Sequence, residues 1–299
     1  MTDQQIPKRV FPGAKEDAAA ANAAKPLPQT ADAAYRLAYQ DSDFLLRDDL
    51  RPVRFQLELM KPELLLAEAG IGSTFVFYGS ARIPAPEDAD ILIRAAATDT
   101  QRRIAERLKA KSHYYEVARE LARVASGSPA SADGKRQFVV RSGGGPAIME
   151  AANRGASDVG AESVGLNIVL PFEQAPNAYV TPHLSFNFHY FALRKMHFLL
   201  HARAIAVFPG GFGTFDEMFE LLTLIQTGKM AVLPILLYGR EFWNRVIDFD
   251  ALVEEGVVAP QDLDLIHFCE TAQEGWDHVQ AFYADNTERQ FRKGRGEGH

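Results

Sequence analysis

The sequence has a single cysteine, Cys269, among its 299 residues. One cysteine cannot form an intramolecular disulfide, and it cannot supply the cysteine cluster of a structural zinc site. Because Cys269 closes the apolar run Leu-Ile-His-Phe-Cys, we expect it to be a small buried hydrophobic residue. We therefore expect neither a disulfide nor a cysteine-bound metal.

The chain also lacks a basic excess and a long apolar run. Its 32 Lys and Arg against 39 Asp and Glu give a formal net charge of −7, whereas nonspecific binders of nucleic acid or membrane surfaces usually carry positive charge. No run of about 18 apolar residues predicts a membrane span, and the N-terminal segment lacks the features of a signal or transit peptide. We therefore expect a cytoplasmic protein that binds neither nucleic acid nor membrane.

The two ends of the chain are poor in large apolar side chains. Residues 1–40 are rich in Ala, Gln, Asp and Pro, so they bury too little surface to offset the entropy of ordering. We expect a disordered tail there, with at most a short Ala-rich helix, and a frayed C-terminus over residues 291–299. Residues 41–290 are predicted to form one domain.

Short apolar runs alternate with helical patterns through this domain. Such alternation, with strands apolar throughout, predicts an α/β fold whose parallel sheet is covered on both faces. Pro146 suits the first turn of one helix, and Gly155 is expected to end it. A charged, helix-prone excursion over residues 84–111 separates the first strand from its helix. We expect strands over 74–79, 137–142, 163–170, 204–208, 234–239 and 264–269, and helices over 114–125, 146–155, 189–202, 214–226 and 274–283.

Three loops leave predicted strands with small residues, at 79–82, 142–150 and 209–217. In an open parallel sheet, ligands bind beyond the carboxyl ends of the strands. Glycine allows close backbone approach, and the amides of a helix start favour an anion. No loop matches GxxxxGK[ST], and the third lacks the last glycine of a dinucleotide fingerprint. These loops predict a phosphate-bearing small molecule; the alternative is that they are tight turns serving only the fold.

Three motifs together resemble those of the LOG ("Lonely guy") family. They are GGGPAIMEAANRGA in the second loop, the Arg194–Lys195 pair, and PGGFGTFDE in the third loop. Its members are cytokinin riboside 5'-monophosphate phosphoribohydrolases, often mislabelled as lysine decarboxylases. The resemblance covers about residues 72–260 and is closest to the longer bacterial branch. It implies a Rossmann-like doubly wound sheet, a homodimer or larger homo-oligomer, no cofactor, and hydrolysis of a nucleotide to free base and ribose 5-phosphate.

The resemblance also implies roles for individual residues. Arg194 and Glu217 fall on the catalytic positions. The loop that holds the phosphate corresponds to residues 209–214, and the family places a substrate-contacting acid near the segment of Glu173. The predicted substrate-binding and phosphate-binding residues are Gly210, Gly211, Gly213, Thr214, Lys195, Gly79, Ser80, Gly144, Gly145, Glu173 and Asn177.

Several of these residues also have a purely structural explanation. Thr214 and Glu217 have the spacing of a capping box, with Thr214 as N-cap. Glu150 and Asn153 are expected to lie on a helix surface. His197 and His201 lie four positions apart, but no nearby acids complete a metal site, so core or interface histidines are expected.

Three questions stay open on the sequence. The base could be a cytokinin-type N6-modified adenine, plain adenine or another purine. A non-catalytic nucleotide or cofactor carrier is the alternative to the enzyme, because fold does not determine function. Arg194 could bind the phosphate or hold Glu217 in its ionised form.

Overall fold

The computed structural model describes residues 11–171 and 175–296, with the backbone alone for residues 286–296. The chain divides into two compact units, Met1–Met60 and Lys61–His299. In neither unit, within the described residues, is a helix both long and apolar enough to cross a membrane.

The first unit is built from short helices. They are α1 (Ala14–Asn22), α2 (Pro28–Ala31), α3 (Ser42–Leu45) and the start of α4 (Arg51–Glu68), which continues into the second unit. No residue of α1, α2 or α3 is buried. This agrees with the low content of large apolar side chains, and α1 is the Ala-rich helix expected there. The disorder of residues 1–40 stays a prediction.

The second unit contains the parallel sheet. Within the described residues, its order is β4-β3-β2-β1-β5-β6-β7, and all neighbouring strands pair in parallel. The α/β prediction is confirmed. The strands are β1 (Thr74–Tyr78), β2 (Val139–Ser142), β3 (Val164–Ile168), β4 (Ser185–Phe188), β5 (Ala202–Val207), β6 (Ile235–Tyr238) and β7 (Ile266–Cys269).

The strand order reverses between β1 and β5. From β1 the chain moves outward through β2, β3 and β4, then returns to the other side of β1 to add β5, β6 and β7. In doubly wound sheets the crevice at such a switch point is where ligands bind. The loops after β1 and β5 lie side by side there, since the Ser80 amide donates to the Pro209 carbonyl at 3.1 Å.

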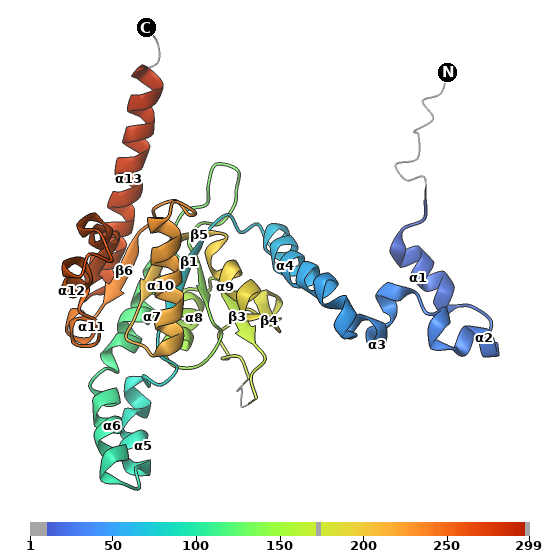
Figure 1. Ribbon diagram of the computed structural model, residues 1–299, viewed down its shortest axis with the longest axis horizontal. Helices are drawn as coiled ribbons and strands as arrows, with labels where there is room; N and C mark the ends of the chain where they lie inside the picture. The colour runs from blue at the N-terminus through green and yellow to red at the C-terminus, as the bar shows by residue number, and fades with distance from the viewer. Residues whose placement is uncertain (1–10, 172–174, 297–299) are drawn as a thin grey trace. The chain divides into compact units, whose positions relative to one another are not determined.

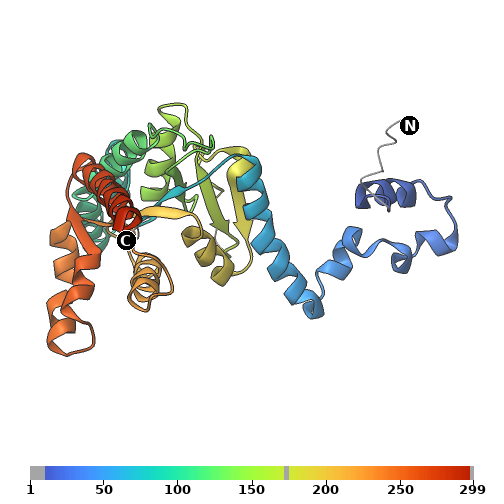
Figure 2. The ribbon, with the colours of Figure 1, turned by 90° about the horizontal axis from the view of Figure 1, so that it is seen from above.

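Helices cover both faces of the sheet (Figures 1 and 2). One face packs on α7 (His113–Ala125), α8 (Ile148–Ser157) and α13 (Ala272–Gly296), and the other on α9 (Phe191–Leu199), α10 (Phe212–Gln226) and α11 (Arg240–Val246). Side chains alternate along β1: Phe75 and Phe77 face the first layer, and Val76 and Tyr78 face the second. Cys269 is buried, as expected.

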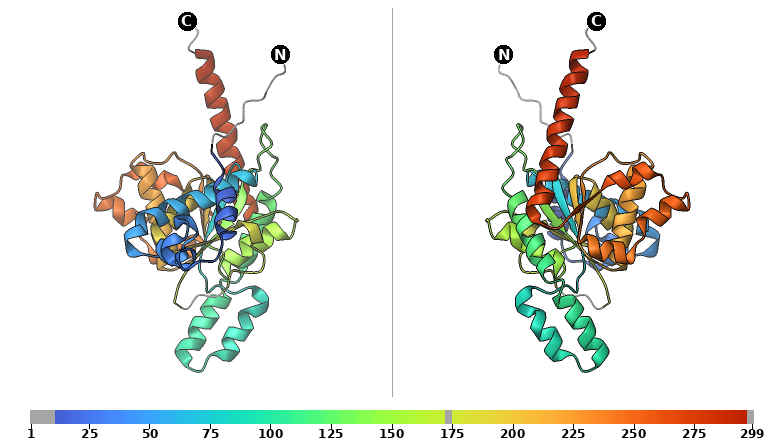
Figure 3. Two further views of the ribbon diagram at one scale, coloured as in Figure 1. Left: turned by 90° about the vertical axis from the view of Figure 1, so that its right-hand side faces the viewer. Right: turned by 90° about the vertical axis from the view of Figure 1, so that its left-hand side faces the viewer.

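The excursion after β1 is a helical hairpin that stands away from the sheet (Figure 3). It contains α5 (Ala89–Ala95) and α6 (Asp99–Lys109). Lys109 Nζ donates to Asp90 Oδ1 at 2.6 Å and joins the two helices. The predicted excursion is confirmed. Because the hairpin follows β1, it begins at the carboxyl edge of the sheet.

Two differences from the predicted elements have clear causes. β4 was not predicted, because the aromatic residues around Phe186 and Phe188 are equally typical of core packing outside a sheet. The pairing with β3 defines the strand. α8 continues two residues past Gly155, so Gly155 does not end the helix. It is buried where α8 crosses α7, and a Cβ there would collide with the Arg119 carbonyl.

Substituting Gly155 tests this close approach. In an open helix, Gly→Ala stabilises by up to about 1 kcal/mol. Here we expect Gly155→Ala to destabilise by about 1–3 kcal/mol, because the added methyl forces α7 and α8 apart. Chemical denaturation measures the change, and Ser157→Ala on the exposed side of α8 is the matched control. A gain in stability for Gly155→Ala would contradict the contact.

Candidate active site

A cavity of about 820 Å³ opens where the switch point was expected. This volume suits a small-molecule ligand. Five segments contribute to its wall: the loop after β1, the first turn of α8, the first turn of α10, the middle of α9, and the end of α11. The lining residues are Gly79, Ser80, Ala81, Arg82, Met149, Arg194, Gly211, Phe212, Gly213, Thr214, Phe215, Glu217 and Val246.

The start of α10 forms the anion-binding part of this wall. Gly211 is the N-cap, and the helix begins at Phe212. The first amides of a helix have no acceptor within it, and the helix dipole adds positive potential at the same end. Gly211, Gly213 and Thr214 all line the cavity, so their backbone can approach a ligand. The arrangement suits a phosphate group.

The predicted capping box is wrong. Thr214 is the third residue of α10 instead of its N-cap, and no side chain caps this helix. The helix starts earlier because Gly210 lacks a Cβ: a Cβ there would collide with the buried Thr214 side chain. Thr214 thus packs over Gly210, and this contact folds residues 210–214 into a tight turn. Gly210 shapes the turn without lining the cavity.

Glu217 lies one turn into α10 and also lines the cavity. Its side chain is 15% exposed, and Oε1 lies 3.8 Å from Nη1 of Arg194. Burial raises the pKa of Glu217 to about 7, while the Arg194 guanidinium lowers it and the Asp216 carboxylate raises it. Near neutral pH, the carboxyl is therefore balanced between its two protonation states.

Arg194 reaches the cavity from α9. Its Nε donates to the Leu166 carbonyl of β3 at 2.7 Å, and its guanidinium lies 5.1 Å from the ring centre of Phe198. With 13% of the side chain exposed, it is not the surface residue that a helical pattern alone would allow. The structure brings the two predicted catalytic side chains, Arg194 and Glu217, into one cavity.

Lys195 points away from this wall. Its Nζ binds Asp216 Oδ1 at 2.9 Å and Glu220 Oε2 at 3.0 Å. It is not among the described residues that line the cavity. Its predicted ligand role stays a prediction, while its observed contacts join α9 to α10.

The loop after β1 supplies Gly79, Ser80 and Arg82 to the cavity. Gly79 packs against Ile148 of α8, where a Cβ would lie 2.5 Å from the isoleucine side chain. Ser80 Oγ accepts from the Arg82 amide at 3.0 Å and fixes the turn. This loop therefore lies beside the turn that begins α10, and its contact with a ligand stays a prediction.

The triple-glycine loop contributes differently from the expectation. Gly144 and Gly145 are absent from the described lining, and Asn177 binds their carbonyl oxygens. Asn153, expected on a helix surface, is fully buried and bonds to Ser142 and Ser163. Glu150 accepts from the Tyr115 hydroxyl at 2.8 Å. Glu173 lies outside the described residues.

Part of the cavity wall could not be predicted from the sequence. Met149, Phe212 and Phe215 lie within recognised motifs but carry no charge or hydrogen-bonding group to mark them. Val246 comes from α11, about 30 residues beyond the motif, and had no local signal. These four side chains add apolar surface to a cavity that is also lined by the charged residues Arg82, Arg194 and Glu217.

The histidines pair with an acid. His201 Nε2 lies 2.8 Å from Glu63 Oε2, and His197 Nδ1 lies 3.5 Å from Glu63 Oε1. His197 is buried, whereas His183 and His189 are exposed. Over residues 11–171 and 175–296, no group of three or more His, Cys, Asp or Glu side chains could hold a metal ion.

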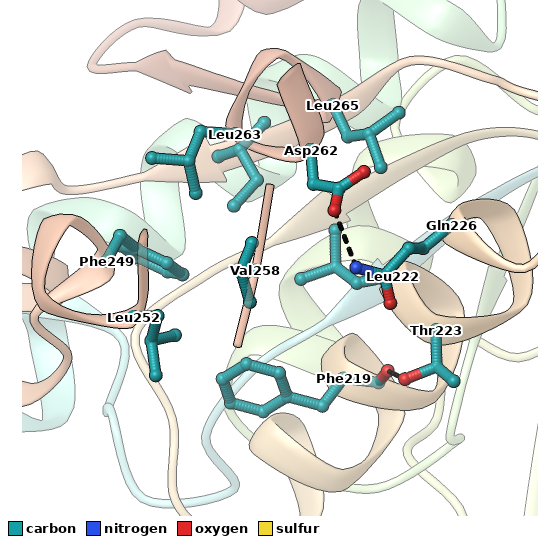
Figure 4. A pocket seen from close by; sticks show the side chains of 11 residues that line it. Phe219, Leu222, Thr223, Gln226, Phe249, Leu252, Val258, Asp262, Leu263 and Leu265 are labelled. Carbon is teal, nitrogen blue, oxygen red and sulfur yellow. Dashed lines mark hydrogen bonds between the residues drawn. The ribbon is translucent and has the colours of Figure 1, made fainter. Parts of the chain in front are cut away.

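A second, smaller pocket of about 100 Å³ lies on the far half of α10 (Figure 4). Figure 4 shows mostly apolar side chains around it, from α10, α12 (Phe249–Glu254) and the turn Pro260–Leu265. One hydrogen bond crosses it, from Gln226 Nε2 to Asp262 Oδ2 at 2.6 Å. It contains none of the predicted site residues.

Comparisons with known proteins agree with the motifs. Residues 149–279 match the family model described as "Possible lysine decarboxylase". The chain is 34% identical over 82 residues to the cytokinin riboside 5'-monophosphate phosphoribohydrolase LOG3 of Arabidopsis thaliana, covering 27% of this chain and 38% of that protein. The resemblance to the LOG family is confirmed.

Two further proteins are similar to the chain, one in sequence over a short segment and one in structure at low sequence identity. The probable LOGL3 enzyme of Oryza sativa subsp. japonica is 32% identical over 90 residues, which is 30% of this chain and 43% of that protein. The molybdenum cofactor binding protein from Rippkaea orientalis has a TM-score of 0.41 at 15% identity, covering 71% of this chain and 98% of that one. The chain thus spans about two-fifths of the length of the LOG relatives named here.

The raised pKa of Glu217 predicts a cost in stability. A carboxyl whose folded pKa is about 7, against an ordinary value of 4.5, binds more protons when folded. Stability is therefore lost as the pH rises from about 4.5 through 7. We expect Glu217→Gln to be more stable than the parent above pH 7, by at most about 3 kcal/mol, and no more stable near pH 4.

Thermal or denaturant unfolding across this pH range measures the difference. Glu220→Gln is the matched control on the same helix, because Glu220 is more exposed and paired with Lys195. A constant offset between Glu217→Gln and the parent at all pH values would contradict the assignment of the pKa.

Proposed function

We propose that this chain hydrolyses the N-glycosidic bond of a nucleoside 5'-monophosphate, giving free base and ribose 5-phosphate. One observation carries the proposal. The phosphate-binding turn of α10 and the Glu217 carboxylate, one helical turn further, line the same cavity. A ribose 5-phosphate bound there would place its phosphate on the turn and its anomeric carbon toward the acid.

The chemistry requires a negative group beneath the sugar. As the bond to the base breaks, positive charge develops on the ribose, and a carboxylate stabilises that charge and orients the attacking water. Glu217 is proposed for this role in its ionised form. The phosphate and Glu217 contact opposite ends of the ribose phosphate, so their mutual repulsion is limited.

Arg194 is proposed to keep Glu217 ionised. Its guanidinium lies 3.8 Å from the carboxylate and lowers the Glu217 pKa against the effect of burial. The hydrogen bond to Leu166 holds the guanidinium at the sheet, so it cannot follow the substrate freely. Its position beside Glu217 favours this role over that of a phosphate ligand.

The names of the relatives support the same reaction, since LOG3 and LOGL3 are phosphoribohydrolases of a nucleoside 5'-monophosphate. The apolar residues of the cavity lining suit a purine, either adenine or an adenine with an apolar N6 group. A homodimer or larger homo-oligomer, and a reaction without a cofactor, are proposed from the same resemblance.

A substrate panel tests the reaction. We expect purified protein to release free base and ribose 5-phosphate from at least one of AMP, N6-isopentenyl-AMP, IMP and GMP. Adenosine should be cleaved far more slowly, because it lacks the phosphate that α10 binds. Chromatography of the products measures both. Tight binding of a nucleotide without release of base from any would favour a non-catalytic carrier.

Replacing Glu217 tests the mechanism. Glu217→Gln keeps the shape of the side chain and removes its charge, so kcat should fall at least about 100-fold. In the parent, kcat/KM should fall as the pH drops below about 7, because Glu217 becomes protonated. The residual activity of Glu217→Gln should lack this acidic limb. Glu220→Gln should keep both, and full turnover by Glu217→Gln would refute the assignment.

A further inference from the structure

Three buried or half-buried polar residues lie behind the triple-glycine loop. Ser142 ends β2, Asn153 lies in α8, and Asn177 precedes β4; we call these three residues the asparagine clamp. Asn153 Oδ1 accepts from Ser142 Oγ at 2.6 Å and from Asn177 Nδ2 at 3.0 Å. Asn153 Nδ2 donates to Ser163 Oγ at 3.0 Å. Ser142 and Asn153 are fully buried, so their hydrogen bonds are shielded from water.

The clamp holds the backbone of the glycine loop. Asn177 Nδ2 donates to the carbonyls of Gly144 at 3.1 Å and Gly145 at 2.9 Å, and the Asn177 amide donates to Gly144 at 2.8 Å. The Gly144 amide donates to Ser142 Oγ at 3.0 Å. Gly144 has φ +73°, a conformation that glycine adopts readily. The loop is therefore fixed from both sides of its turn.

The glycine loop is in turn the surface on which Arg194 rests. A Cβ on Gly143 would lie 2.7 Å from Nη2 of Arg194, so the guanidinium is in direct contact with this backbone. The Arg194 Nε donates to the Leu166 carbonyl at 2.7 Å, which holds the near end of the guanidinium at the sheet, and the Gly143 backbone lies against Nη2 at its tip. Movement of Gly143 would shift the tip relative to Glu217.

We propose that Asn177 and Asn153 are positioning residues: through the glycine loop, they hold the Arg194 guanidinium at its distance from Glu217. This inference rests on the proposed function of Arg194 and Glu217. It assigns to Asn177 a role different from the substrate contact expected from the sequence. It also gives a role to Asn153, Asn177 and the three consecutive glycines. Both asparagines, Gly144 and Gly145 lie near the cavity without lining it.

Two uncharged substitutions test the positioning. Asn177→Leu keeps the approximate size and removes the side-chain donor to the Gly144 and Gly145 carbonyls, while the backbone donor to Gly144 remains. Gly143→Ala leaves the clamp intact and pushes against both the Arg194 guanidinium and the Met149 side chain, whose Sδ would also lie 2.7 Å from the added Cβ. The φ of Gly143 lies outside the left-handed region, so alanine fits the backbone. We expect each to lower kcat by about 10–100-fold, because a misplacement of about 1 Å is costly, with a smaller change in KM.

The pH dependence separates positioning from simple loss of stability. The groups around Glu217 are Arg194 and Lys195 of α9, Asp216 and Glu220 of α10, and Tyr78 of β1. Neither substitution changes any of these groups. If the guanidinium moves away from Glu217, its stabilisation of the carboxylate weakens, and the acidic limb of kcat/KM should move to higher pH in both variants. Asn187→Leu, exposed on β4, is the control and should leave the limb in place.

A second measurement does not depend on turnover. Carbon NMR of labelled glutamate, with the Glu217 signal assigned by its loss in Glu217→Gln, follows the titration of that carboxyl directly. A higher Glu217 titration midpoint in both folded variants supports the clamp even if no nucleotide is cleaved. An unchanged midpoint in Gly143→Ala and Asn177→Leu, whether or not they melt earlier, would overturn it. Failure of the parent to release base would refute the proposed function alone.

Discussion

A turn whose open amides suit an anion shares one end of α10 with a carboxylate, and the proposed site depends on keeping both there. The open amides of residues 212–214 favour a phosphate, while Glu217 lies only one helical turn away. Two negative groups this close repel, and burial makes ionisation of the acid less favourable still. Arg194 opposes the effect of burial from α9, and the pKa of Glu217 near 7 reflects burial together with Arg194 and the neighbouring charged side chains.

Glycines in the surrounding structure maintain this balance, because they leave room for neighbouring side chains. Gly210 makes room for Thr214, so the helix can begin at the cavity edge. Gly143 makes room for Arg194, and Gly79 makes room for Ile148 beneath the first loop. In each case a backbone approaches another group more closely than a Cβ would allow. The glycines of the three loops thus serve packing around the cavity as much as contact with a ligand.

Local patterns predicted much of this arrangement. The apolar runs identified six of the seven strands and their parallel pairing, because strands buried on both faces are apolar throughout. They missed β4, whose pairing with β3 no local pattern reveals. The capping box failed for a related reason: the spacing of Thr214 and Glu217 fits an N-terminus, but the turn at Gly210 moved the helix start to Phe212. Gly155 likewise fits a helix end, whereas its contact with α7 explains it.

The sequence by itself determined the type of fold, the three loops and the resemblance to the LOG family, because these depend on periodicity and short spacings along the chain. Only the tertiary structure decided which residues meet. It placed Arg194 beside Glu217, turned Lys195 toward Asp216 and Glu220, and set Asn177 against the glycine carbonyls. Val246 joined the cavity from α11. These outcomes depend on how α9, α10 and α11 pack on the sheet, and packing between elements distant in sequence leaves no signal in any one of them.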